Sequence, residues 1–222
     1  PTFQYFCRKN KPFQPIFPLT PYILSALGGY ILGSIPLGYL LVKFRARVDI
    51  RTSGSGNVGA YNAGVVTGST AVGIAVGLLD AGKGLAATIG AWLLFGTFWP
   101  VALALLGSVI GHIAPVWLRW KGGRGLATAC GGFFAVGLGF IIVWCTLWAV
   151  CKWQKLSIVT SNVVAIIATP VILTLLPANT VALVMTSETS PSEFKILAFC
   201  LAGVLLVSHR DVLKEFREER ES

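Results

Sequence analysis

The chain has 222 residues, of which 55% are hydrophobic and only 12% are charged, and its mean hydropathy is +0.74. Because a soluble domain usually carries about 25% charged residues, this composition excludes an ordinary soluble fold. The formal net charge of +9 comes from basic residues that flank apolar stretches, which argues against nucleic acid as a partner. We expect this basic surface to meet membrane lipids or phosphorylated small molecules.

Six apolar stretches dominate the organisation of the chain. A helix that spans a bilayer needs about 17–25 mainly apolar residues, and most of these stretches approach or exceed that length. The pattern predicts one all-α integral membrane domain. Because the stretches are continuously apolar and do not alternate, it does not fit a membrane β-barrel. The expected spans are residues 21–42, 65–94, 98–118, 126–150, 157–176 and 194–207.

Two segments flank the membrane domain, which we assign to residues 21–207. Residues 1–20 form a basic, Pro-rich extension without the apolar core of a signal peptide, and we expect it to be irregular. Residues 208–222 are strongly charged, and we expect them to form a cytoplasmic helix.

Lysine and arginine residues gather in four segments and leave two connecting segments bare. The bare segments are 95–99 and 177–193, and the basic ones are 43–51, 119–124, 152–155 and 210–220. The positive-inside rule places the basic segments in the cytoplasm. Since both ends of the stretch 126–150 are then inside, we expect it to cross twice as two short helices. This gives about seven transmembrane helices, with the N-terminus outside and the C-terminus cytoplasmic.

The segment DIRTSGSGNVGAYNAG, residues 49–64, places glycines, hydroxyls and amides directly after the first apolar stretch. Glycine permits positive φ, so that several backbone N–H groups can converge on one anion. Arg51 adds charge-assisted hydrogen bonds, while Ser55, Asn57 and Asn62 add further polar groups. The segment predicts phosphate binding, although the same residues also suit a flexible loop with cytoplasmic arginines.

A second segment, RWKGGRGLATACGG at residues 119–132, repeats this chemistry on the same expected face of the membrane. Lys121 and Arg124 alternate with glycines, and Thr128 lies where the next helix is expected to begin. Because helix N-termini favour anions, two such loops together favour a phosphate site over two unrelated flexible loops.

Four of the ionisable residues in or beside the apolar stretches are candidates for a functional role. Asp80 and Lys83 are three residues apart and can pair on one helix face. Charged groups inside a membrane are functional candidates, but a purely structural ion pair explains them equally well. His112 and His209 are candidate general bases, or residues that cap helix ends. Two histidines so far apart are too few to hold a metal ion, and no metal is expected.

Three stretches in a fixed order carry a family resemblance: LGSIPLGYLLVKF…VDIRTSGSGNVGAYNAG, DAGKG and GHIAPVWLRWKGGRGLATACG. They resemble the bacterial acyl-phosphate:glycerol-3-phosphate acyltransferases of the PlsY type, over residues 27–135. The resemblance implies a seven-helix enzyme of the bacterial inner or a related membrane, with its motif loops in the cytoplasm. It implies acyl transfer from acyl phosphate to the 1-position of glycerol 3-phosphate, giving lysophosphatidate without coenzyme A, metal or other cofactor.

The resemblance also assigns candidate site residues. The family pattern GSGNxGATN fits the first loop, KGGKGVATxxG fits the second with Arg124 in place of a lysine, and RHxxN fits at His209. The candidate catalytic residues are Ser55, Lys121 and His209. The candidate substrate- and phosphate-binding residues are Arg51, Gly54, Gly56, Asn57, Asn62, Lys83, Gly122, Gly123, Arg124 and Thr128. The two loops would hold two phosphate groups, and proximity would supply most of the rate.

Four positions depart from the family patterns, namely Tyr61, Val65, Ser208 and Val212. They leave a second hypothesis open, in which the chain is a catalytically silent relative that serves as an accessory subunit of a larger membrane complex. A third and weaker hypothesis is a transporter for a phosphorylated small molecule, suggested by Gly-rich helices and charges within the membrane.

Overall fold

The computed structural model describes residues 19–186 and 189–210, and the expected all-α fold is confirmed. Most of the extension 1–20 and of the tail 208–222 lies outside these residues, so the assigned domain limits stay predictions. The helices are α2 (Thr20–Ser34), α3 (Leu37–Ala46), α4 (Ala60–Thr67), α5 (Thr70–Phe95), α6 (Phe98–Ile113), α7 (Leu126–Val136), α8 (Gly139–Trp153), α9 (Ile158–Leu175), α10 (Ala178–Ala182) and α11 (Pro191–Ser208), with 3-10 turns at Ile50–Thr52 and Val116–Leu118.

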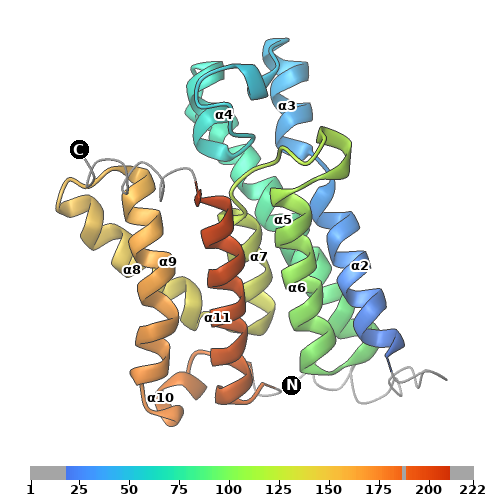
Figure 1. Ribbon diagram of the computed structural model, residues 1–222, viewed down its shortest axis with the longest axis vertical. Helices are drawn as coiled ribbons and strands as arrows, with labels where there is room; N and C mark the ends of the chain where they lie inside the picture. Colours follow the sequence, from blue (N-terminus) through green and yellow to red (C-terminus); the bar gives the residue numbers. More distant parts are fainter. Residues whose placement is uncertain (1–18, 187–188, 211–222) are drawn as a thin grey trace.

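The long helices stand side by side as a bundle (Figure 1). In the described part of the chain, five segments are long and apolar enough to cross a membrane: Thr20–Ala46, Thr70–Phe95, Phe98–Leu118, Ile158–Leu175 and Pro191–Ser208. The stretch 126–150 forms two shorter apolar helices, α7 and α8, as predicted. The total of seven crossings stays a prediction.

The two ends of the bundle differ in the connections that they carry. Figure 1 shows α3, α4, the segment between α6 and α7, and the connection between α8 and α9 at one end. The connection between α5 and α6 lies at the other end, together with α10. The basic segments 43–51, 119–124 and 152–155 therefore share one end, and the bare segments share the opposite one. This grouping agrees with the expected parity, while the side that faces the cytoplasm stays a prediction.

The first predicted span is broken, which corrects the expectation of one continuous helix over 21–42. α2 ends at Ser34 and α3 begins at Leu37, with Ile35 in an extended conformation between them (φ −61°, ψ 118°). Pro36 explains the break, because proline lacks an N–H and disfavours helical backbone in the residue before it. The break leaves carbonyl groups at its edge that need partners from neighbouring helices.

The second predicted span, 65–94, begins later than expected. Its first residues belong to α4, which ends where Gly68 takes the left-handed conformation (φ +63°). The side chain of Ser69 then accepts a hydrogen bond from the N–H of Val72 and caps α5. The long membrane helix is therefore Thr70–Phe95. The residues before it form α4, which belongs to the first Gly-rich loop.

Reciprocal glycine contacts bring α2 and α6 together backbone to backbone. A Cβ added at Gly29 or Gly33 of α2 would overlap the carbonyl groups of α6 residues. In the other direction, a Cβ at Gly107 or Gly111 of α6 would overlap carbonyl groups of α2. Small residues at helix interfaces permit such close approach in membranes, so the glycines of these two helices fix their relative register.

The same kind of glycine contact joins α5 to α7. A Cβ at Gly84 would overlap the carbonyl of Thr128, and a Cβ at Gly131 would overlap the carbonyl of Ala81. Gly84 directly follows Lys83, and α7 directly follows the second Gly-rich loop. The contact between α5 and α7 therefore places the second loop close to Asp80 and Lys83 of α5.

We predict that Gly29→Ala destabilises the protein while Gly28→Ala does not. The two glycines are neighbours on α2, but a Cβ at Gly28 meets no atom of the described residues within 4 Å, whereas one at Gly29 meets the backbone of Ala104. Overpacking of this kind costs about 1–3 kcal/mol. Thermal unfolding of both variants in the same detergent measures the difference, and equal melting temperatures would contradict the close packing of α2 and α6.

Candidate functional site

The first Gly-rich loop is organised by the buried side chain of Asn62 on α4. Its Oδ1 accepts a hydrogen bond from the N–H of Ser55 at 3.0 Å. Its Nδ2 donates toward three carbonyl oxygens, those of Ile50 at 3.3 Å, Ser53 at 3.0 Å and Asn57 at 2.9 Å. Both ends of the amide are thus committed to the loop backbone, which favours a loop-shaping role over the predicted contact with substrate.

Glycines give this loop its turns. Gly54 and Gly56 have φ values of +60° and +71°, a conformation that strains residues with a Cβ. The Oδ1 of Asn57 accepts a hydrogen bond of 2.9 Å from the N–H two residues later. The side chain of Ser55, in contrast, is exposed. Of the polar residues predicted here, Ser55 remains open to a ligand.

Arg51 is paired within the loop. Its Nη2 lies 2.6 Å from Oδ2 of Asp49, and its Nε donates to Oδ1 at 3.0 Å. The guanidinium also lies 5.0 Å from the ring centroid of Tyr39, within cation–π range. The hydrogen bond from Arg51 lowers the pKa of Asp49 to about 2. Because 30% of the Arg51 side chain is still exposed, the pairing orients the guanidinium without enclosing it.

The second Gly-rich loop rests on the C-terminal end of α6. The N–H of Gly122 donates to the carbonyl of Ile113 and the N–H of Gly123 to that of His112, both at 3.1 Å. A Cβ at Gly122 would overlap the His112 carbonyl, and a Cβ at Gly123 would overlap the imidazole ring. These glycines permit close approach, and their N–H groups are bonded within the protein instead of pointing at a ligand.

The remaining predicted residues of the second loop differ in their solvent exposure. The side chain of Lys121 is exposed and that of Arg124 is partly exposed. Thr128 is completely buried on α7, and its Oγ1 has no hydrogen-bond partner in the described part of the chain. The burial of Thr128 gives no support to its predicted contact with phosphate, whereas the side chain of Lys121 is exposed to the surroundings.

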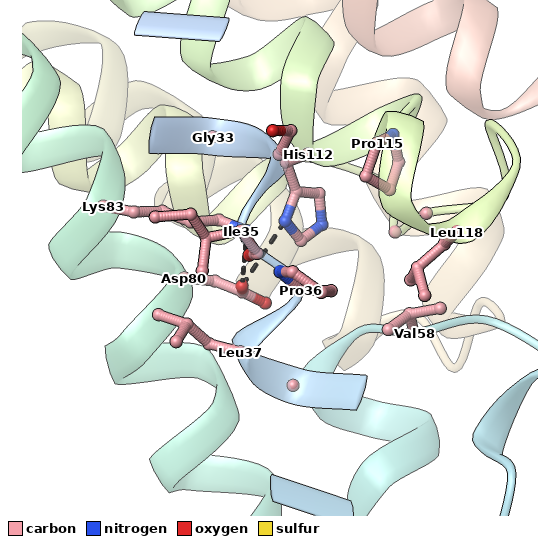
Figure 2. A pocket seen from close by; sticks show the side chains of 14 residues that line it. Gly33, Ile35, Pro36, Leu37, Val58, Asp80, Lys83, His112, Pro115 and Leu118 are labelled. Atoms are coloured by element: carbon pink, nitrogen blue, oxygen red, sulfur yellow. Dashed lines mark hydrogen bonds and ion pairs between the residues drawn. The ribbon is translucent and has the colours of Figure 1, made fainter. Parts of the chain in front are cut away.

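A buried charged cluster lies beneath the two loops (Figure 2). Nζ of Lys83 lies 3.1 Å from Oδ1 of Asp80, and Nδ1 of His112 lies 3.4 Å from the same oxygen. The His112 contact is electrostatic, because Nδ1 makes no hydrogen bond of good geometry within the described residues. Lys83 also donates to the carbonyl of Ile35 at 3.2 Å. The pairing predicted for Asp80 and Lys83 is confirmed, with His112 as a third member.

A small pocket opens over this cluster. It is lined by residues 33–38 at the break between α2 and α3, Val58, Asp80, Lys83, His112, Pro115, Leu118, Gly122 and Gly123. Figure 2 shows one ring nitrogen of His112 directed at Asp80 and the other directed away from it. The structure thus brings both loops, α5 and the end of α6 to one place. The contribution of the broken first helix was not predicted, and Pro36 is the signal that would have revealed it.

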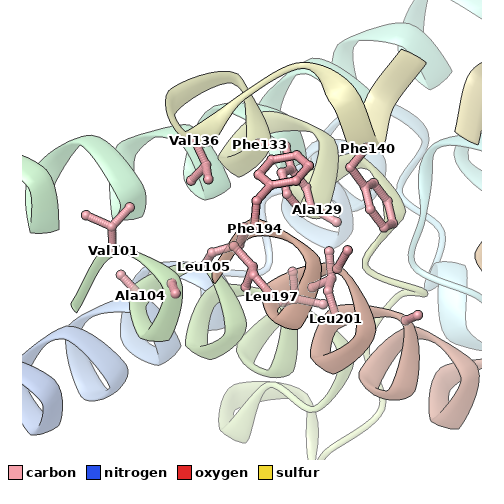
Figure 3. Packing of buried hydrophobic residues seen from close by; sticks show 14 of the residues in the cluster. Val101, Ala104, Leu105, Ala129, Phe133, Val136, Phe140, Phe194, Leu197 and Leu201 are labelled. Carbon is pink, nitrogen blue, oxygen red and sulfur yellow. The ribbon is translucent and has the colours of Figure 1, made fainter. Parts of the chain in front are cut away.

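The helix α11, which ends directly before His209, is anchored by the hydrophobic core. Phe194, Leu197 and Leu201 of α11 pack with Phe133 of α7 (Figure 3). The rings of Phe133 and Phe194 meet edge to face with centroids 5.6 Å apart. Because these contacts are apolar and tight, they fix where the end of α11 meets the second loop.

His209 lies beside the second loop but is enclosed. Its Nδ1 lies 2.8 Å from the carbonyl of Leu205 and 3.1 Å from Oγ of Ser208, which in turn donates to the carbonyl of Arg124 at 3.0 Å. The side chain is fully buried, and Nε2 contacts no partner among residues 19–186 and 189–210. Burial lowers the pKa of the His209 imidazole, which disfavours its charged form. Its predicted role as a general base gains no support from this position.

Comparison with known proteins identifies the family. The model of the glycerol-3-phosphate acyltransferase family matches residues 23–219. A glycerol-3-phosphate acyltransferase of Pelagibacter ubique (strain HTCC1062) is 34% identical over 205 residues, which cover 90% of this chain and 96% of the relative. Another, of Rhodopseudomonas palustris (strain BisB5), is 35% identical over 201 residues, with 90% and 95% covered. The chain belongs to the glycerol-3-phosphate acyltransferase family.

Solved structures agree with this assignment. The crystal structure of PlsY, an integral membrane glycerol 3-phosphate acyltransferase, in its glycerol 3-phosphate form has a TM-score of 0.74 and 28% sequence identity. The similarity covers 90% of this chain and 93% of that chain. Its lysophosphatidic acid form has a TM-score of 0.72. The expected family, the integral membrane fold and a membrane acyltransferase are confirmed, and the bacterial relatives agree with a bacterial inner membrane.

We predict that Asn62→Ala loosens the first loop, because it removes the acceptor for Ser55 and the donor to three carbonyl groups. Leaving such groups without partners costs about 1–3 kcal/mol. Limited proteolysis between residues 50 and 57 should become faster than in the unmodified protein. Asn179→Ala is the matched control, since that asparagine is exposed and bonds only to the N–H of the next residue among its described contacts. Equal cleavage rates in the two variants would contradict the role of Asn62.

Proposed function

We propose that this member of the glycerol-3-phosphate acyltransferase family transfers a fatty acyl group from acyl phosphate to the 1-hydroxyl of glycerol 3-phosphate, giving lysophosphatidate. The observation that carries the proposal is the meeting of two Gly-rich, basic loops at one pocket, where Val58 comes from the first loop and Gly122 and Gly123 from the second. The glycerol 3-phosphate and lysophosphatidic acid forms of the similar PlsY structure support the same acceptor and product.

The proposed reaction needs no protein nucleophile. The oxygen of the 1-hydroxyl bonds to the acyl carbon, the bond between that carbon and the phosphate oxygen breaks, and inorganic phosphate leaves with the hydroxyl proton. Both substrates are anions, so their approach requires cations, and holding them together supplies most of the rate. Among the predicted residues, Lys121, Arg124 and Arg51 carry cationic side chains that are at least partly exposed on these loops.

Lys121 is the candidate for stabilising the departing phosphate, since its side chain is exposed and the loop that carries it is bonded to the end of α6 through Gly122 and Gly123. Ser55 is the candidate for orienting a substrate oxygen, because its hydroxyl is exposed while its N–H is held by Asn62. The enclosure of His209 favours a phosphate oxygen as the proton acceptor. In this mechanism His209 supports the second loop through Ser208, which donates a hydrogen bond to the carbonyl of Arg124.

The alternative is a catalytically silent relative that serves as an accessory subunit of a larger membrane complex. It is motivated by the departures from the family patterns. Tyr61 and Val65 are 67% and 56% exposed on α4, so neither is required by the packing of the described helix bundle. Val212 lies outside the described residues. The family match favours the enzyme over the transporter.

An acyl-transfer assay separates the two proposals. The purified full chain is incubated with palmitoyl phosphate and radiolabelled glycerol 3-phosphate, and in parallel with palmitoyl coenzyme A. Labelled lysophosphatidate from palmitoyl phosphate alone is the expected result. No product from folded, monodisperse protein would overturn the enzyme, and a partner that copurifies in fixed stoichiometry would then support the accessory subunit.

We predict that Lys121→Ala lowers turnover by about 100-fold or more, as expected when a charge-stabilising group is lost from an active site. Folding should be unaffected, because the side chain is exposed. Lys152→Ala is the matched control: it removes a lysine from the same end of the bundle, where its Nζ donates to the carbonyl of Leu156. Full activity in the Lys121 variant, or equal losses in both, would contradict the assignment.

A further inference from the structure

The cluster around Asp80 joins segments that are far apart in the sequence. The side chains of Asp80 and Lys83 are 3% and 5% exposed, and that of His112 is 7% exposed. Charges inside a membrane are costly, and they persist where they are paired and where they serve a function. The Asp80 carboxylate and the Lys83 ammonium already balance each other's charge. Neutrality alone requires only two of the three groups.

Asp80 reaches the broken first helix through Lys83. The Lys83 ammonium contacts Oδ1 of Asp80 at 3.1 Å and the carbonyl of Ile35 at 3.2 Å. That carbonyl also accepts from the N–H of Leu37 at 2.9 Å. The carboxylate therefore holds a lysine whose second contact satisfies the backbone at the break, which a helix interrupted within a membrane requires.

Asp80 reaches the second loop through His112. Nδ1 of His112 lies 3.4 Å from Oδ1 of Asp80, and the carbonyl of the same residue accepts the N–H of Gly123 at 3.1 Å. A Cβ at Gly123 would overlap the ring at Nε2. The backbone of the loop thus lies directly on the imidazole, and the rotation of that ring is limited by the carboxylate on its other side.

We propose that Asp80 is a positioning residue that holds the second Gly-rich loop in place through His112. Asp80 touches no reacting atom in this proposal. Its carboxylate orients the ring on which Gly123 rests, and the loop then presents Lys121 to the phosphate of the substrate. The catalytic consequence rests on the proposed function, whereas the effect on the loop does not require it.

A purely structural ion pair makes a different prediction. If Asp80 serves only to neutralise Lys83, then removing both charges together leaves the loop unchanged. If Asp80 also orients His112, the same double change loosens the loop even when the charge balance is kept. The variant Asp80→Asn with Lys83→Met therefore separates the two, since it removes the carboxylate without leaving an unpaired ammonium in the membrane.

Hydrogen–deuterium exchange of the peptide that covers residues 119–125 provides a readout that needs no activity. The full chain is measured in lipid nanodiscs, without substrate, as wild type and as the double variant. His112→Phe is the second variant, because it keeps the Asp80–Lys83 pair and removes the ring nitrogen that faces Asp80. Ser108→Ala is the matched control for loss of a buried polar group on α6, where the hydroxyl donates to the carbonyl of Leu105.

We expect exchange in the second loop to rise at least tenfold in the double variant and in His112→Phe, and to stay at the wild-type rate in Ser108→Ala. Turnover with palmitoyl phosphate should fall at least tenfold in the first two variants. Wild-type exchange of the loop in the double variant would overturn the proposal. If that variant does not fold, wild-type exchange in His112→Phe overturns it equally. An inactive wild type would refute the proposed function, while the exchange rates would still decide the role of Asp80.

Discussion

The close backbone contact between α2 and α6 is the constraint on which the rest of the site depends. Lipid tails are as apolar as the side chains that they solvate, so helices in a membrane associate mainly by close packing. The glycines of these two helices allow that packing, and further bonds tie their ends: Tyr30 donates to the carbonyl of Ala114 at 3.0 Å, and Nε1 of Trp117 donates to Oγ of Ser34 at 3.0 Å. The broken end of α2 is thereby held against the end of α6.

A second glycine contact, between α5 and α7, completes the site from the other side. It sets α7 against the part of α5 that carries Asp80 and Lys83. The second loop connects the end of α6 to the start of α7, so both of its ends are fixed by helix packing. Helix packing therefore sets where the loop begins and ends, while its conformation between these points depends on local contacts such as that of His112 with Gly123.

The sequence was informative where a local pattern has one physical meaning. Apolar length predicted the helices, the absence of lysine and arginine from 95–99 and 177–193 predicted how connections group at the two ends, and glycines among basic residues predicted both loops. It was uninformative where the meaning depends on tertiary partners. An asparagine such as Asn62 serves a ligand or a backbone equally well, and its four hydrogen bonds to its own loop favour the backbone role. The burial of His209 likewise follows from the packing of α11.

The two lysines of the candidate site, Lys83 and Lys121, have different surroundings and are therefore suited to different roles. Lys83 is enclosed between the Asp80 carboxylate and the Ile35 carbonyl. A phosphate could therefore bind its ammonium only by displacing one of these two groups. Lys121 is exposed within the second loop, where an anion would meet its charge without such a displacement. In the proposed function, anion binding at the exposed lysine and loop support at the buried one are therefore separate tasks. The arrangement gives the loops fixed geometry while the side chain of Lys121 stays exposed.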